Sequence, residues 1–131
     1  MKNTNVYLSF LLLLSLCVSV SCHKTASVSP PTLSISSPLV DDSFSGGQVI
    51  TIKGETTDAV NLHALTIKIT DDKTGAVLFT SSPPCHDLKT FAFNVTWTAK
   101  VSDWTDATVS IISENHDEMQ TVKTVKIKIW L

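Results

Sequence analysis

The chain has 131 residues, of which 43% are hydrophobic and 17% charged, and its formal net charge is −2 at pH 7. All ten of its basic residues are lysines. We therefore expect no nucleic-acid partner, because recognition of phosphates and base edges needs a basic surface and usually arginine. The length suits one domain with a core of its own and is short for two.

The first 21 residues have the parts of a secretory signal peptide. Lys2 supplies a positive charge, an almost unbroken apolar run covers residues 6–20, and small side chains precede Cys22. The apolar run is shorter than the roughly 20 residues that a lasting transmembrane helix needs. We therefore expect residues 1–21 to act as a signal peptide.

The sequence SVSC at residues 19–22 resembles a bacterial lipobox of the loose type found in Bacteroidetes lipoproteins, in which a small residue precedes an acylated cysteine. The resemblance implies that the mature chain begins at Cys22 and is anchored in a membrane by its acyl chains. Cys17 fits less well, because the bulky Leu16 precedes it. Residues 22–31 are rich in Ser and Pro and predict a solvated tether. No acidic residue directly follows Cys22, which favours a lipid-anchored outer-membrane protein that faces the periplasm.

From Thr32 onward, short segments of alternating apolar residues are separated by turn residues, and no segment has a sustained helical period. The expected strands lie, in chain order, at residues 32–36, 48–53, 64–70, 76–80, 91–97, around 109–111 and 121–131. Val122 has the opposite parity to Val125 and the apolar residues that follow it, so we expect a β-bulge near Lys123. About seven strands within residues 32–131 predict an all-β, immunoglobulin-like or fibronectin-type sandwich.

Three segments resemble bacterial immunoglobulin-like and cadherin-like surface modules. Residues 31–38 (PTLSISSP) resemble their opening strand, residues 46–54 (GGQVITIKG) their second strand, and residues 113–117 (SENHD) their penultimate loop. Together with the leader, the chain is similar to an uncharacterised family of Bacteroidetes lipoproteins with one such module. The resemblance implies the fold and an envelope location, and it brings no established activity with it.

Alternate loops of an antiparallel sandwich lie at the same end, so the loops near residues 55–61, 81–88 and 114–120 are expected to meet. These loops and the adjoining strand end hold every histidine of the domain, and they predict a transition-metal site formed by His63, Cys85, His86 and His116. Imidazoles with one thiolate suit zinc or copper. His63 shares parity with the apolar residues of its strand, which predicts that its ring leans over the core.

Two alternatives stay open for this end of the domain. The loop carboxylates resemble those of cadherin-like loops and would supply oxygen ligands to calcium from Asp58, Glu114, Asp117 and Glu118. In the other alternative no metal binds, Cys85 fills a gap in the core, and the histidines are ordinary loop residues. At the opposite end, we interpret Trp104 as a hydrophobic plug under its loop in preference to a carbohydrate-stacking residue.

The sequence contains neither a Gly-x-Ser-x-Gly elbow nor a glycine-rich phosphate loop that leads into a helix. We therefore predict that the protein is not an enzyme. The expected function is that of a lipid-anchored binding module of the cell envelope, which presents its loops to another envelope protein, a glycan or a metal ion. The alternative function is a small envelope enzyme that uses Cys85 or a metal-bound water.

Overall fold

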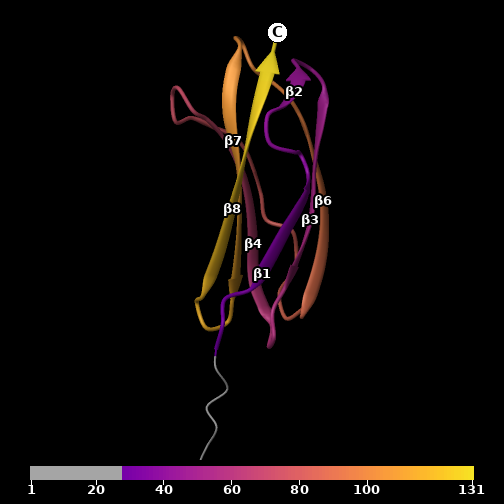
Figure 1. The fold of residues 1–131 in the computed structure, drawn as a ribbon, viewed down its shortest axis with the longest axis vertical. Coiled ribbons are helices and arrows are strands. Elements are labelled where there is room, and N and C mark those ends of the chain that lie inside the picture. Colours follow the sequence, from indigo (N-terminus) through magenta and orange to yellow (C-terminus); the bar gives the residue numbers. More distant parts are fainter. Residues whose placement is uncertain (1–27) are drawn as a thin grey trace, which may run out of the picture.

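The computed structural model describes residues 28–131, and the expected signal peptide, Cys22 and most of the expected tether lie outside this range. The described part contains the strands β1 (Thr32–Ser37), β2 (Asp42–Ser45), β3 (Val49–Thr57), β4 (Leu62–Asp71), β5 (Val77–Ser81), β6 (Thr90–Thr98), β7 (Thr105–Asn115) and β8 (Gln120–Trp130) (Figure 1). Within residues 28–131, no helix has the length and hydrophobicity needed to cross a membrane.

The strands form two sheets that pack face to face (Figure 1). One sheet has the strand order β1-β3-β6 and the other the order β2-β8-β7-β4-β5. Neighbouring strands pair antiparallel except β2, which runs parallel to β8. The predicted all-β immunoglobulin-like sandwich is confirmed. The additional strand is β2, whose sequence DSFS holds a single large apolar residue and therefore gives little alternation to recognise.

The core lies between the two sheets and consists of every second side chain of the long strands, as the pleat of a strand requires. Its fully buried members include Ile50, Ile52, Ile67, Ile111 and Ile129. On β6, Phe93 is only 3% exposed. Its neighbours on the same face, Phe91, Val95 and Trp97, are partly buried against the core, which confirms the face expected from the alternation.

A close contact between strands surrounds Gly54, which pairs with Phe93 on β6 and with Ile35 on β1. A Cβ atom at position 54 would overlap the carbonyl oxygen of Ser34 and the ring of Phe93. Glycine is therefore required at this point of β3, because any side chain would separate the strands or displace the ring.

The pairing of β7 with β8 is regular from Thr105 opposite Ile129 to Glu114 opposite Gln120. The bulge expected near Lys123 is therefore wrong. Val122 lies opposite Ile112, and its side chain is 54% exposed. The parity of Val122 was misleading because single apolar residues are common on protein surfaces and need not join the core.

Candidate metal site

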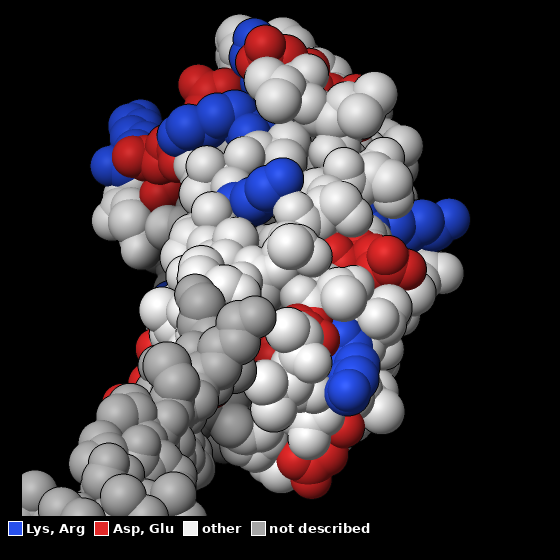
Figure 2. Space-filling view, turned by 60° about the horizontal axis from the view of Figure 1, so that its bottom comes forward, with Lys and Arg blue, Asp and Glu red and all other residues white. Residues whose placement is uncertain are grey.

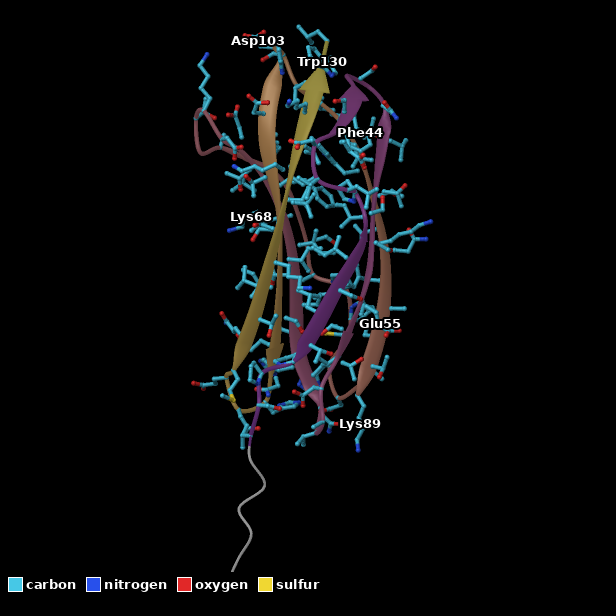
Figure 3. All side chains as sticks on the ribbon, in the orientation of Figure 1. Phe44, Glu55, Lys68, Lys89, Asp103 and Trp130 are labelled. Atoms are coloured by element: carbon cyan, nitrogen blue, oxygen red, sulfur yellow. The ribbon has the colours of Figure 1, made fainter. Side chains whose placement is uncertain are left out.

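Three loops meet at the end of the sandwich where β1 begins (Figure 1). The backbone N–H of Asp58 donates to the carbonyl of Lys89, and that of Leu62 donates to the carbonyl of Leu88, which joins the β3–β4 loop to the β5–β6 loop. The Asn115 amide donates to the Asp58 carboxylate at 3.1 Å and so joins the turn between β7 and β8 to the same loops. Figure 3 places the labelled Lys89 at this end. The predicted convergence of the three loops is confirmed.

His63 enters this end from an irregular position of β4. Leu62 pairs with Asn115 and Ala64 pairs with Glu114, so the register shifts at His63, as in a β-bulge. The shift turns Leu62 into the core and leaves His63 exposed. The expectation that the His63 ring leans over the core is wrong, because the bulge reverses the parity on which it rested.

The imidazoles of His63, His86 and His116 gather into one group, which we call the histidine cluster. The ring centroids of His63 and His86 are 5.4 Å apart, those of His63 and His116 are 5.1 Å apart, and those of His86 and His116 are 4.8 Å apart. One potential ligand atom from each ring lies within 4.8 Å of those from the other two, and all three residues are exposed. A bound zinc ion would hold such nitrogens about 3.3 Å apart, so the exposed rings would have to rotate toward one another to bind it.

Asp87 contacts two rings of the cluster. Its Oδ2 lies 3.0 Å from Nδ1 of His86, and its Oδ1 lies 2.9 Å from Nε2 of His116. The residue has a φ of 64°, a conformation in which Asp and Asn are enriched, and its backbone N–H donates to the carbonyl of Leu62. The carboxylate is thereby held between two histidines that come from different loops.

Cys85 does not belong to the cluster. Its side chain is 1% exposed and lies among the hydrophobic core residues. Burial raises the pKa of its thiol, which disfavours the thiolate that binds metals and acts as a nucleophile. The structure therefore brings together three of the four side chains predicted for a transition-metal site.

The four carboxylates predicted for calcium are not gathered into one group. Within residues 28–131, the histidine cluster is the one set of three or more His, Cys, Asp or Glu residues close enough to hold a single ion. Asp58 is 5% exposed and accepts hydrogen bonds from Val60 N–H and the Asn115 amide. Glu114 accepts a hydrogen bond from Gln120, while Asp117 and Glu118 are exposed in the turn after β7.

Asn115 organises the base of the site, and the sequence analysis did not identify it. Its side chain is 2% exposed, and its amide nitrogen donates to Asp58 and to the carbonyl oxygen of Ser29. Its amide oxygen accepts hydrogen bonds from the N–H groups of Asp117 and Met119 and so shapes the turn that carries His116. The available signal was an Asn at the end of a strand, where Asn commonly bonds to the backbone of a turn.

The opposite end of the sandwich is aromatic. The rings of Trp104 and Trp130 pack at a centroid distance of 4.2 Å and remain 55% and 40% exposed. Figure 3 shows Trp130 beside Asp103 at the end far from Lys89. The interpretation of Trp104 as a buried plug is wrong, since the ring covers Trp130 and not the core.

Comparison with solved structures finds domains of similar fold. The fibronectin(III)-like modules of Clostridium thermocellum CbhA match with a TM-score of 0.54 at 17% identity, over 77% of this chain and 47% of that chain. This chain thus spans about half the length of that solved chain. The CARDB domain of a Pyrococcus furiosus protein in complex with di-metal ions matches with a TM-score of 0.43 at 8% identity, over 82% and 99% of the two chains. No protein-family model and no curated protein matches the sequence.

The strand arrangement and the similarity to the fibronectin(III)-like modules define an immunoglobulin-like β-sandwich domain. At this level of identity the similarity concerns the fold, and the fold hosts many unrelated functions. The function must therefore be argued from the residues of the site.

Proposed function

We propose that the protein is a lipid-anchored interaction module of the cell envelope that binds one zinc or copper ion through the histidine cluster. The observation that carries this proposal is the convergence of three exposed imidazoles from the start of β4, the β5–β6 loop and the turn between β7 and β8. Imidazole nitrogen is a favoured ligand of both metals, and three such ligands are typical of protein sites that leave one position open.

The hydrophobic core gives no reason for the cluster. His63, His86 and His116 are all exposed and add nothing to the hydrophobic core. Within the domain the three rings contact one another, and two of them contact Asp87. A metal ion supplies a favourable interaction that would account for the arrangement.

The location of the cluster supports a role near a membrane surface. The carbonyl of Ser29, just before β1, accepts a hydrogen bond from Asn115 at the same end of the domain. Ser29 lies seven positions after Cys22 in the sequence, and at about 3.5 Å per residue this stretch spans at most about 25 Å. With Cys22 acylated, the histidine cluster would lie on the membrane-proximal end of the domain, facing other components of that surface. The charges on this side are mixed, with lysine and acidic side chains interspersed (Figure 2).

The alternative of a cysteine enzyme loses its support in the structure. A nucleophilic cysteine needs access to substrate and a lowered thiol pKa. Cys85 is 1% exposed, and burial raises its pKa. We therefore propose a binding role without catalysis by Cys85.

The test is calorimetric titration of the purified full-length chain, without a polyhistidine tag, with zinc and with copper(II) at neutral pH. We expect close to one ion per chain at the cluster. Replacement of His63 or His116 by Ala should lower the affinity at least about tenfold, since each change removes one of three ligands.

Lys126→Ala is the control for this titration, because Lys126 is 61% exposed and pairs with Asp72, apart from the cluster. The Lys126→Ala variant should bind both metals as tightly as the wild type does. The proposal fails if neither metal binds saturably, or if the double variant of His63 and His116 binds as tightly as the wild type.

A further inference from the structure

Asp87 is the residue around which two members of the cluster are arranged. It places one carboxylate oxygen on each ring, 3.0 Å from Nδ1 of His86 and 2.9 Å from Nε2 of His116. Each of these rings therefore directs a different nitrogen away from Asp87, namely Nε2 of His86 and Nδ1 of His116. His63 lies against both rings and completes the triangle.

A histidine that binds a metal commonly has a carboxylate partner on its other ring nitrogen. A carboxylate that accepts the N–H of one ring nitrogen fixes the tautomer and leaves the other nitrogen with its lone pair toward the ion. It also raises the basicity of the ring as a ligand. Asp87 is suited to do this for His116, to which it is hydrogen-bonded, while its other oxygen lies 3.0 Å from Nδ1 of His86 in a close contact without the geometry of a hydrogen bond.

We propose that Asp87 is a positioning residue, which orients His86 and His116 so that the cluster binds its ion through three imidazoles and leaves one position open to a small exchangeable ligand. This inference rests on the proposed metal-binding function and goes beyond it by assigning a role to Asp87 and a chemical class to the remaining ligand. That ligand is water or a small monodentate anion.

The open position follows from what surrounds the cluster. Cys85 is buried in the core, and among residues 28–131 no further His, Cys or carboxylate completes the set to four. Each carboxylate oxygen of Asp87 already lies against a ring nitrogen, so Asp87 is not counted as a ligand of the ion. The side chains of His86 and His116 are 56% and 39% exposed, so solvent reaches the place where an ion would lie.

The backbone holds Asp87 in place independently of its carboxylate. Its φ of 64° is a conformation that Asn adopts as readily as Asp, and its N–H donates to Leu62. Asp87→Asn therefore preserves the loop and the size of the side chain. It removes one acceptor oxygen, because an amide nitrogen cannot accept the N–H of a ring.

The experiment compares zinc affinities of the full-length wild type, Asp87→Asn and Asp117→Asn. Asp117 is the matched control: it is exposed, adjoins His116 in sequence, and its loss changes the net charge equally. We expect Asp87→Asn to bind zinc about 10 to 100 times more weakly, as is usual when a partner of a ligating histidine is lost. Asp117→Asn should stay within about threefold of the wild type, and the melting temperatures of the metal-free variants should agree within a few degrees.

A spectroscopic readout separates positioning from simple stability. Cobalt(II) replaces zinc as the probe, because its visible absorption responds to coordination number and geometry. Azide should change the spectrum of the cobalt-loaded wild type saturably by occupying the open position. At saturating cobalt, Asp87→Asn should show an altered spectrum, since its rings are no longer held in one orientation.

Several results would overturn this inference while leaving metal binding intact. These are equal zinc affinity of Asp87→Asn and wild type, an equal loss in Asp117→Asn, a cobalt spectrum that azide leaves unchanged, or a zinc-loaded structure with an Asp87 oxygen about 2.0 to 2.2 Å from the ion. If the wild type binds no metal at all, the proposed function fails together with the role of Asp87.

Discussion

Cys85 and His86 are neighbours in the sequence and lie in opposite environments. The Cys85 side chain is 1% exposed in the core, whereas the His86 side chain is 56% exposed. Cys85 begins the turn that Leu88 N–H closes by donating to the Cys85 carbonyl, and His86 lies within that turn, where it is exposed. This difference in burial explains why a predicted site that used both residues is reduced to its histidines.

Burial should make the Cys85 thiol inert toward alkylation. The pKa of the thiol is raised by burial, so the neutral form is favoured in the folded state, and the fold loses stability as pH rises above the thiol's usual range. In a variant with Cys17 and Cys22 replaced by Ser, iodoacetamide at pH 8 should modify the folded protein at least about 100 times more slowly than the urea-unfolded protein.

Mass spectrometry over time measures this protection, and zinc should not reduce the rate in the unfolded control. Rapid alkylation of the folded variant would contradict the burial of Cys85. It would also reopen the question of whether the thiol reaches the histidine cluster.

The sequence predicts which residues meet where only the residue type and the position of its loop are needed. The three histidines were predicted to meet because alternate loops share an end of a sandwich, and they do. Asp87 and Asn115 were not assigned roles, because their functions depend on which atoms face them across different loops. Such pairings are fixed by tertiary packing and leave no period in the sequence.

At the level of elements, the two β-bulge assignments show the limit of parity arguments. A bulge was expected near Lys123, where β7 and β8 pair regularly, and none was expected at His63, where the register of β4 shifts. Alternation in the sequence describes which residues are apolar. A bulge depends on how two strands are paired, and that information is long-range.

The turn between β4 and β5 carries a pH-sensitive contact. Asp72 accepts hydrogen bonds from Thr108 on β7 at 2.5 Å and from Lys126 on β8 at 2.7 Å. Burial acts to raise the pKa of Asp72, but the hydrogen bonds from Lys126 and Thr108 outweigh it, so the pKa is lowered. Three strands of the larger sheet are thus connected through one carboxylate.

We predict that Asp72→Asn destabilises the domain at neutral pH by up to about 1 kcal/mol, a small effect because Lys126 is mostly exposed. The lowered pKa means that the contribution is present above the usual Asp pKa of about 3.9 and is lost as pH falls through the lower value in the folded state. Urea unfolding at pH 7 and at pH 2.5 measures this, and the difference between variant and wild type should be smaller at the lower pH.

Asp106→Asn is the control for the pH series, since Asp106 borders the same surface pocket of about 350 Å³ as Asp72 and Lys126. Its stability should differ little from that of the wild type at either pH. If Asp72→Asn destabilises the domain as much at pH 2.5 as at pH 7, the carboxylate charge is not the cause.

The whole molecule has two chemically different ends. The histidine cluster lies at the end where β1 begins, and the paired rings of Trp104 and Trp130 lie at the other (Figures 1 and 3). Asn115 connects Ser29, the first residue of the described chain to bond to the sandwich, with the turn that bears His116. The position of Ser29 and the geometry of the cluster are therefore linked through one buried side chain.

An acyl anchor at Cys22 would determine which of these ends faces the membrane. We predict that Cys22→Ser, expressed in a bacterium with an outer membrane, loses incorporation of a fatty-acid analogue and leaves the lipid-anchored membrane fraction. The reason is that several acyl chains on Cys22 would hold the protein stably in the membrane, whereas a single acyl chain binds a membrane only reversibly.

Cys17→Ser is the matched control, since Cys17 follows the bulky Leu16, and it should be labelled and fractionate like the wild type. Label retained on Cys22→Ser would refute the anchor, and label lost from Cys17→Ser alone would move it five residues toward the N-terminus.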